Sequence, residues 1–396
     1  MNSEVKMSQT IIQKHLPVKA VSPADGHCFF GYFDKFATDE KDERILVHKV
    51  GFTARQPRLG DKALIGVIEG NDFTPVAETL AWNWQQGSML QWFSRDSIIY
   101  NDLEGDTYVA RIHNLVTGSR RTLCRPVYCL SPDRKWGLSL NFIRLDRERP
   151  GYGYSGLYDS GMGHGYPDFD GIWLIDIERN RSRLIISLAQ MVELFPHDGM
   201  DHAVNWFNHL LISPDSKRFA FFHRWRVFGP WGAGICSHLT HMFTADLDGG
   251  NIYPLNLDEF SSHYAWVSPT QIINYSNRKA TGNQYHLFTD RTDHVEVIAR
   301  DVFPGDGHCT FSPDGKWMLS DSYPQKDSCR RLYLYDLMRC QAYEIGRFYA
   351  DLQYPAPTRC DLHPRWFRNG RMISFDSIHE HRRRMYVMDL SEITGS

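Results

Sequence analysis

Four histidines lie about four residues ahead of a recurring Ser-Pro turn, each in a different segment of the chain. They are His209 in NHLLISP, His263 in SHYAWVSP, His308 in HCTFSP and His363 in HPRWFRNG. Neutral imidazoles on separate rigid strands suit a divalent metal such as zinc or manganese. One such histidine alone would be explained by a buried hydrogen bond, so the prediction of a metal site depends on the shared position of all four.

Two further side chains near His363 could complete such a site. Asp361 is two residues earlier, on the same side of an extended strand, and could add a carboxylate. Cys360 could supply a thiolate instead. The predicted metal set is therefore His263, His308, His363 and Asp361, with Cys360 as the alternative to Asp361.

Arg224 follows His223 in the segment FHRWR and is expected to stand next to His209. A guanidinium has a planar fork that matches a carboxylate, so Arg224 is a candidate clamp for an anionic ligand. The alternative is a surface arginine paired with a neighbouring aspartate. Tyr152, in RPGYGY, belongs to an aromatic segment suited to stacking on sugar rings, although such residues also fill cores.

The elements that must position these residues form a sevenfold repeat. A turn and strand recur, followed by a second apolar strand that mostly ends in an Asp- or Asn-containing turn. The turn copies are FATDEKDERILVHK at 36, FSRDSIIYND at 93, SPDRKWGLSL at 131, SPDSKRFAFF at 213, SPTQIINYS at 268, SPDGKWMLSD at 312 and WFRNGRMISFD at 366. Short β-rich runs at this spacing predict an all-β, seven-bladed β-propeller with four antiparallel strands per blade.

A single propeller over residues 21–396, preceded by an extension over 1–20, is the predicted domain organisation. Two separate β-sandwiches are the alternative, which the common register of the seven copies argues against.

The repeat spacing stretches at 144–170 and 225–240, where long loops would carry binding functions. Residues 187–195 form the one segment with helical periodicity. In blades one to three the histidine position holds Asp34, Leu90 and Val127.

Composition excludes several classes of partner. The chain has 396 residues, 44 basic against 47 acidic, and this balance does not predict nucleic-acid binding. No segment approaches the roughly 20 apolar residues of a membrane span, and the N-terminus lacks a signal-peptide core. A cytoplasmic location is the resulting expectation, and the oligomeric state stays open.

The histidine register, with DGHCTFSPDGKW and DLHPRW as its best copies, resembles that of the β-propeller polysaccharide lyases, of which oligogalacturonate lyase and the propeller ulvan lyases are the types. The Ser-Pro-Asp-Gly turn itself is shared with other propellers, including TolB-like ones. The resemblance implies a metal held by histidines and a glutamine near the last blades. His363 and His308 match ligand histidines, whereas Asp361 stands at the position of another metal ligand of the family and Thr358 at the position of the glutamine.

The function implied is β-elimination in a glycan that contains uronic acid. Removing the C5 proton requires neutralisation of the adjacent carboxylate, which Arg224 and the metal would provide. His209 is the expected base, and Tyr152 or His223 the proton donor to the leaving oxygen.

Two other functions compete with this one. A non-catalytic propeller could bind glycan or protein as a scaffold in bacterial surface-polysaccharide synthesis, since the chain also looks like propeller proteins found with such genes. A hydrolase could use Asp102, Asp321 and Asp376, although these carboxylates also suit turns and contacts between blades. Glycine-rich phosphate loops, nucleophile elbows and HExxH motifs are absent from the sequence.

Overall fold

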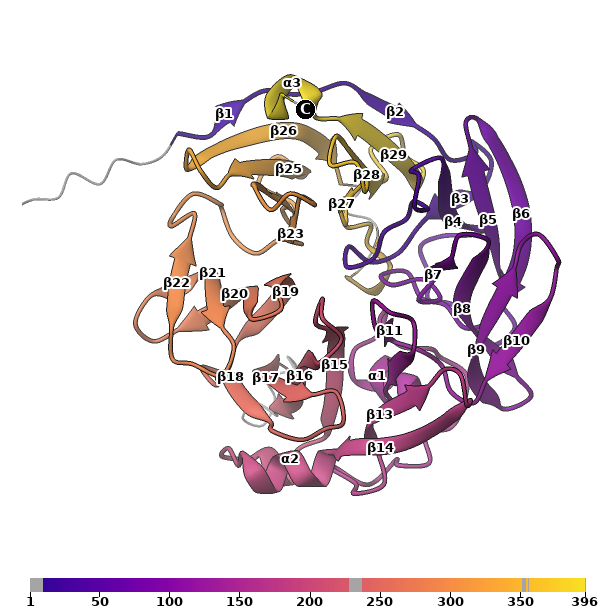
Figure 1. Ribbon diagram of the computed structural model, residues 1–396, viewed down its shortest axis with the longest axis vertical. Coiled ribbons are helices and arrows are strands. Elements are labelled where there is room, and N and C mark those ends of the chain that lie inside the picture. Colours follow the sequence, from indigo (N-terminus) through magenta and orange to yellow (C-terminus); the bar gives the residue numbers. More distant parts are fainter. Residues whose placement is uncertain (1–9, 228–236, 351–353, 355, 396) are drawn as a thin grey trace, which may run out of the picture.

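The computed structural model describes residues 10–227, 237–350, 354 and 356–395. Seven antiparallel sheets are arranged around a central channel (Figure 1). This confirms the predicted all-β, seven-bladed β-propeller, in place of two separate sandwiches. The innermost strand of each blade faces the channel, and the following strands step outward.

Blades one to six each contain four consecutive strands. Blade seven contains three consecutive strands, and a strand from the N-terminal segment adds the fourth. Blades one to three contain β3 (His27–Phe29), β4 (Arg44–Val50), β5 (Ala63–Glu69) and β6 (Asp72–Thr79), then β7 (Gln91–Ser94), β8 (Ser97–Glu104), β9 (Thr107–Asn114) and β10 (Arg120–Leu123), then β11 (Cys129–Leu130), β12 (Trp136–Ser139), β13 (Gly171–Asp176) and β14 (Arg181–Ser187). Blades four and five contain β15 (Asn205–Ile212), β16 (Arg218–Val227), β17 (Ser237–Asp246) and β18 (Tyr253–Asn256), then β19 (Ser261–Ser268), β20 (Gln271–Arg278), β21 (Gly282–Thr289) and β22 (Val295–Ile298). Blades six and seven contain β23 (Thr310–Phe311), β24 (Trp317–Asp321), β25 (Cys329–Asp336) and β26 (Gln341–Tyr349), then β27 (Arg365–Trp366), β28 (Met372–Ser377) and β29 (Arg384–Asp389).

The N-terminal segment closes the ring. Strand β2 (Val18–Ala20) pairs antiparallel with β29 as the outer strand of blade seven, and β1 (Ile12–Gln13) pairs parallel with β26 of blade six. Both run along the outside of the last two blades (Figure 1). Because the first residues of the chain complete its last blade, opening the ring would break a sheet.

The recurring Ser-Pro-Asp sequence works as a hydrogen-bonded turn. In blade six the hydroxyl of Ser312 donates to Asp314 and accepts from the backbone N–H of Trp317, while Asp314 also accepts from the N–H of Lys316. The same pattern starts at Ser131 and Ser213. These side-chain bonds satisfy turn N–H groups and join the two innermost strands of a blade.

Helices occur only in the connections of the described chain. Helix α2 (Leu188–Leu194) confirms the predicted helical segment, and the Ser187 hydroxyl caps it by accepting from the N–H of Gln190. Helix α1 (Phe142–Glu148) lies in the longer insertion and was not predicted. The remaining helical turns are α3 (Ser391–Thr394) and the 3₁₀ turns η1 (Met200–His202) and η2 (Ala356–Thr358).

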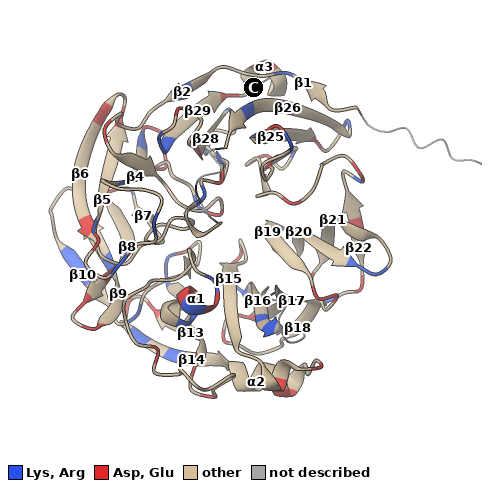
Figure 2. Cartoon of the chain, turned by 180° about the vertical axis from the view of Figure 1, so that it is seen from behind, with Lys and Arg blue, Asp and Glu red and all other residues tan. Residues whose placement is uncertain are grey.

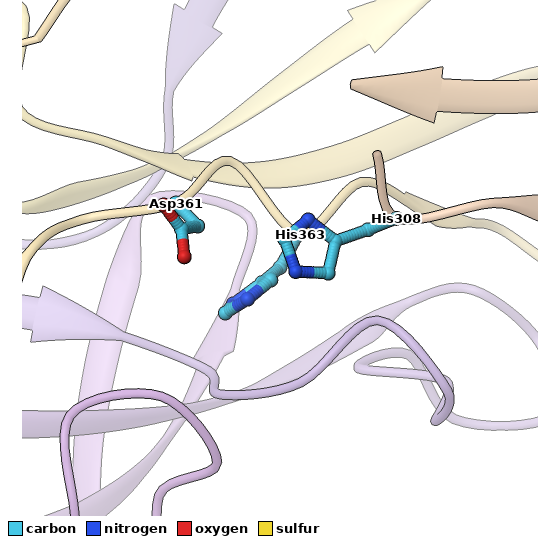
Figure 3. A group of neighbouring side chains, drawn as sticks. All are labelled: His308, Asp361 and His363. Carbon is cyan, nitrogen blue, oxygen red and sulfur yellow. The ribbon is translucent and has the colours of Figure 1, made fainter. Parts of the chain in front are cut away.

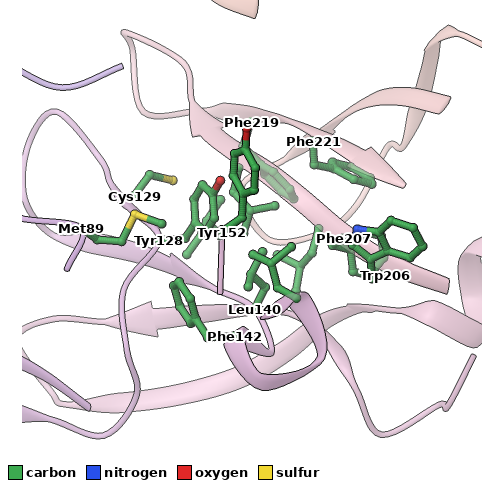
Figure 4. Close-up of a cluster of buried hydrophobic side chains, with 14 of the residues drawn as sticks. Met89, Tyr128, Cys129, Leu140, Phe142, Tyr152, Trp206, Phe207, Phe219 and Phe221 are labelled. Carbon is green, nitrogen blue, oxygen red and sulfur yellow. The ribbon is translucent and has the colours of Figure 1, made fainter. Parts of the chain in front are cut away.

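Apolar side chains fill the spaces between neighbouring blades. The largest cluster joins blades three and four with the insertion, and Figure 4 shows part of it, including Tyr128, Phe142, Tyr152 and Phe207. Helix α1 rests on this cluster through Phe142 and Leu145. The aromatic core therefore anchors the insertion that carries Tyr152.

Charged residues of both signs are mixed around the molecule (Figure 2). No helix in the described part of the chain is both long and apolar enough to cross a bilayer. The predicted insertion at 225–240 falls largely on residues 228–236, which lie outside the described residues.

Candidate metal centre and neighbouring pocket

The four histidines come together at one end of the channel. The ring of His308 lies between those of His263 and His363, with centroids 3.9 Å and 4.3 Å away. The ring centroid of His209 is 6.3 Å from that of His263. The structure thus gathers side chains from four consecutive blades, although their sequence positions are about 50 residues apart.

Tyr32, from blade one, occupies the centre of this group. Its ring stacks on His209 at 5.1 Å and meets His363 edge-on at 5.0 Å. Its hydroxyl lies 3.2 Å from Nε2 of His209. Burial raises the pKa of the Tyr32 hydroxyl well above its usual value, which keeps it protonated.

Carboxylates hold two of the imidazoles in one orientation. Asp321 accepts from Nδ1 of His308 at 2.9 Å, and Asp306 lies 2.9 Å from Nδ1 of His263. A carboxylate on Nδ1 fixes the tautomer and leaves Nε2 free as an electron-pair donor, which is the usual arrangement behind a metal-bound histidine.

The unsatisfied atoms of this cluster fit a metal ion. Nε2 of His308 and Nε2 of His363 are buried without a hydrogen-bond partner among the described residues. One ligand atom each from His308, His363 and Asp361 lies within 4.8 Å of the others (Figure 3). Burial lowers the pKa of His363 well below its usual value, so the ring is neutral and can donate an electron pair.

Asp361 is held by two arginines. Its Oδ1 accepts from Arg330 at 2.9 Å and its Oδ2 from Arg359 at 2.6 Å. Although burial raises the pKa of Asp361, these cations hold it far below the usual range. A carboxylate offers about four acceptor positions, so both ion pairs leave electron pairs for a metal. Burial raises the pKa of Cys360 to about 11, and this thiol stays protonated and outside the ligand group.

The backbone has unusual conformations and close contacts at several residues of this cluster. His209 and His363 have φ angles of +50° and +43°, in the left-handed region that non-glycine residues rarely adopt. Gly307 precedes His308, and a Cβ there would approach the carbonyl oxygen of Asp321 to 1.9 Å. Strained or glycine-dependent backbone that persists at a cluster of polar residues is typical of functional sites.

Arg224 and His209 both contact the ring of Phe222, at 4.9 Å and 5.3 Å from its centroid. Burial first, and then the charge of Arg224, lower the pKa of His209 well below its usual value. Burial and the nearby charge of Arg149 lower the pKa of Arg224 to about 10, so the guanidinium stays charged at neutral pH. Its Nε donates to Thr240, and it forms no ion pair with a described residue.

Tyr152 connects the histidines to a pocket of about 450 Å³. Its ring lies 6.1 Å from that of His209, and its hydroxyl accepts a hydrogen bond from Arg359 at 3.0 Å. The polar residues that line the pocket are Arg147, Glu148, Arg149, Tyr152, Arg226, His238 and Arg359.

The charge of this pocket is strongly positive. Glu148 is bound by Arg147 and Arg226, and Arg359 is bound by Asp361. Arg149 forms no ion pair in the described chain, and its buried Nε has no partner there. Arg149, which lines the pocket, and Arg224, which is buried nearby, therefore have no carboxylate partner among the described residues.

The structure does not bring His223 to this group. Alternate side chains of β16 point to opposite faces, so His223 turns away from the side that carries Phe222 and Arg224. Its Nε2 bonds to Asn205 at 2.9 Å, and its ring packs against Phe207 and Trp225. Burial and the neighbouring His241 lower its pKa to about 3.

The three aspartates of the hydrolase alternative have structural partners. Asp321 binds His308, Asp376 makes a bidentate pair with Arg365, and Asp102 pairs with Arg111. The three carboxylates are thus engaged in ion pairs that hold strands and blades together.

Several residues of the site were missed from the sequence. Tyr32 was overlooked because the blade-one position was assigned to Asp34, which instead pairs with Lys35. Asp306 contacts a histidine of the preceding blade, and Arg149 reaches Tyr152 through an irregular insertion. The one available signal was the clustering of arginine and aromatic residues in RERPGYGY.

The architecture belongs to the class of seven-bladed β-propellers. Among solved structures, an oligogalacturonate lyase in complex with manganese is similar, with a TM-score of 0.69 and 15% identity over 98% of both chains. The oligogalacturonate lyase of Vibrio parahaemolyticus gives a TM-score of 0.64 and 15% identity over 96% of both chains. These similarities confirm the predicted resemblance at the level of the fold.

Other propellers are also similar. A puromycin-hydrolysing peptidase of Mycobacterium tuberculosis gives a TM-score of 0.51 and 11% identity, over 98% of this chain and 56% of the peptidase. No protein-family model matches the sequence, and no curated protein matches it. The reaction must therefore be argued from the site itself.

Proposed function

We propose that this protein is a metal-containing lyase that cleaves glycans with uronic-acid residues by β-elimination. The observation that carries the proposal is the coincidence, at one end of the channel, of carboxylate-oriented imidazoles and two unpaired guanidiniums. A structural scaffold needs neither feature. The oligogalacturonate lyases of similar fold act on an acidic oligosaccharide, as their name states.

The metal would be held by His308, His363 and Asp361, with His263 as a further ligand. Nε2 of His263 is the ring nitrogen opposite its bond to Asp306. When bound, a divalent cation such as manganese or zinc would withdraw charge from a substrate carboxylate and so acidify the neighbouring C–H group. Histidine donors favour a first-row transition metal over magnesium or calcium.

The chain's own residues would bind the acidic substrate through the arginine pocket. Arg149 and Arg224 would pair with the carboxylate of the sugar at the cleavage point, because neither is engaged by a carboxylate of the described chain. Arg147 and Arg226 would add positive potential for neighbouring acidic sugars. The aromatic face of Tyr152 lies between this pocket and the histidines.

His209 would act as the base. Its neutral ring takes the C5 proton, the C4–O bond breaks, and a C4–C5 double bond forms in the uronate. Tyr152 would give its proton to the departing oxygen, and its bond from Arg359 leaves its own O–H free to donate. His223 has no part in this step, because it lies on the other face of β16.

The direct test is incubation with acidic oligosaccharides such as oligogalacturonate, with and without added manganese or zinc. Elimination creates a conjugated double bond, so the product absorbs in the ultraviolet, and mass spectrometry would find no water added. Neutral oligosaccharides serve as the substrate control and His308→Ala as the protein control. Tight binding of acidic glycan without an unsaturated product would instead support the non-catalytic binding propeller.

A further inference from the structure

The opposite mouth of the channel contains a second cavity, of about 630 Å³. All seven blades line it, and the prolines of the turns, Pro132, Pro214 and Pro313, mark it as the face away from the histidines. In β15, for example, His209 lies toward one mouth and Ile212 toward the other. The volume is within the range of roughly 300–1,000 Å³ that small-molecule sites occupy.

Phe33 separates the two ends of the channel. It lines the second cavity, and its ring lies 5.1 Å from that of His308 and 5.7 Å from that of His263. The second cavity is therefore distinct from the histidine cluster, although one aromatic side chain touches both.

The second cavity is lined by two arginines that form no ion pair within the described part of the chain. Arg134 and Arg368 line it, and neither forms an ion pair with a described residue. Arg134 makes a long contact of 3.5 Å to the side-chain oxygen of Gln91, and Nε of Arg368 donates to the backbone oxygen of Asp39. Burial, and then the charge of Arg368, lower the pKa of Arg134, whereas the charge of Glu40 acts in the opposite direction.

The other charges of this cavity are already compensated. Lys35 is bound to Asp34 at 2.8 Å, and Arg365 is bound by both oxygens of Asp376. The excess positive charge of the cavity therefore belongs to Arg134 and Arg368. Two like charges in a half-buried cavity are stabilised when an anion binds between them.

Aromatic side chains form a large part of the wall of the cavity. Trp92, Trp266, Trp366 and Phe311 line it, and flat aromatic faces suit a ring-shaped ligand. The side chain of Trp366 is almost fully buried, and its indole N–H has no acceptor in the described chain. The buried hydroxyl of Thr310 likewise has no partner there.

We propose that this far mouth binds a small organic anion that carries a ring, such as a sugar carboxylate or a sugar phosphate. The anionic group would contact Arg134 and Arg368, and the ring would lie against the tryptophans. The proposal is independent of the lyase activity, which uses the other mouth.

Isothermal titration calorimetry of the full chain tests this proposal. The probes are glucuronate and glucose 6-phosphate, with glucose and inorganic phosphate as controls for the ring alone and the charge alone. We expect one or both acidic sugars to bind, and each of Arg134→Gln and Arg368→Gln to weaken binding about tenfold, the effect of losing one charged hydrogen bond. Comparing the affinities of glucuronate and glucose 6-phosphate shows whether the site prefers a carboxylate or a phosphate.

Two control variants separate this site from the lyase pocket. Arg179→Gln removes an exposed arginine elsewhere, and Arg359→Gln removes a cation of the pocket at the histidine end. Both are expected to retain binding at the far mouth. The proposal is overturned if neither acidic sugar binds, or if binding survives in Arg134→Gln and Arg368→Gln but is lost in Arg359→Gln.

Discussion

Asp321 holds His308 by two hydrogen bonds, from the backbone N–H at 2.7 Å and from the ring Nδ1 at 2.9 Å. Its second oxygen accepts from the backbone N–H of His363 at 3.2 Å. One carboxylate thus orients His308 and His363, the two histidines of the cluster whose buried Nε2 atoms have no partner in the described chain. Gly307 makes this possible, because any side chain there would collide with the backbone of Asp321.

Asp321→Asn should weaken metal binding without removing a ligand. An amide cannot accept from the ring and both N–H groups as the carboxylate does, and loss of such a partner typically costs about 10–100-fold in metal affinity. Competition titration with a chelating dye measures the affinity. Asp314→Asn, in the turn of the same blade, is the control. Equal affinity in Asp321→Asn and the unaltered protein would contradict this role.

Arg149→Gln and Arg224→Gln should each weaken binding of acidic oligosaccharide. Each removes one unpaired guanidinium, and a hydrogen bond to a charged group contributes about 1.5–3 kcal/mol, or about 10–100-fold in affinity. Calorimetry with oligogalacturonate measures the change, and Arg339→Gln, on an exposed turn, is the control. Undiminished affinity in both Arg149→Gln and Arg224→Gln would show that these arginines do not bind the substrate.

Tyr152→Phe should lower kcat while leaving KM nearly unchanged. The variant keeps the aromatic face but loses the proton donor, and general acid catalysis contributes about 10²–10⁴-fold. Tyr154→Phe is a matched control two residues away, since the Tyr154 hydroxyl binds the buried Asn101. If both variants lose activity equally, the effect is structural and Tyr152 is not the donor.

His48 predicts a pH dependence of stability that is separate from the metal centre. Its Nδ1 bonds to the carbonyl of Phe30 and its Nε2 to Ser88, and burial lowers its pKa to about 4. The unfolded chain takes up a proton near the ordinary value of 6.5, whereas the folded chain does not until about pH 4. Stability is therefore complete above pH 6.5 and is lost as the pH falls toward 4, by on the order of 3 kcal/mol.

Urea unfolding between pH 7.5 and pH 4.5 measures this dependence. His48→Gln should be less stable at pH 7.5 but should lose less stability on acidification than the unaltered chain. His294→Gln, which changes a largely exposed side chain, should leave the slope as it is. An unchanged slope in His48→Gln would contradict the assignment of a neutral buried ring.

The repeat was predictable because each Ser-Pro-Asp copy encodes its own turn. The hydroxyl of Ser312 bonds to Asp314 and to the backbone N–H of Trp317, and these bonds span at most five residues of sequence. The local sequence therefore contains the information for the turn. The closing strand β2 was not visible in this way, because Val18 pairs with Met388 at the far end of the chain. The segment 1–20, expected to precede the propeller, supplies β1 and β2 to its last two blades.

The site could be predicted in part for the same reason. His209, His263, His308 and His363 occupy equivalent places in a repeat, and the channel brings equivalent places together. Their partners follow no repeat. Tyr32 reaches His209 across the channel, and Asp306 reaches His263 from the next blade, so neither contact has a periodic signal. His223 was misplaced because alternation along β16 turns it away from Arg224.

Metal content per chain tests the central claim most directly. The protein would be purified without a histidine tag or chelator and analysed for manganese and zinc beside His308→Ala, with His294→Ala as the control. We expect about one metal ion per chain in the unaltered protein and the control, and a loss of the metal in His308→Ala. If the unaltered protein holds no metal after incubation with manganese or zinc, or if His308→Ala holds as much, the proposed metal centre is wrong.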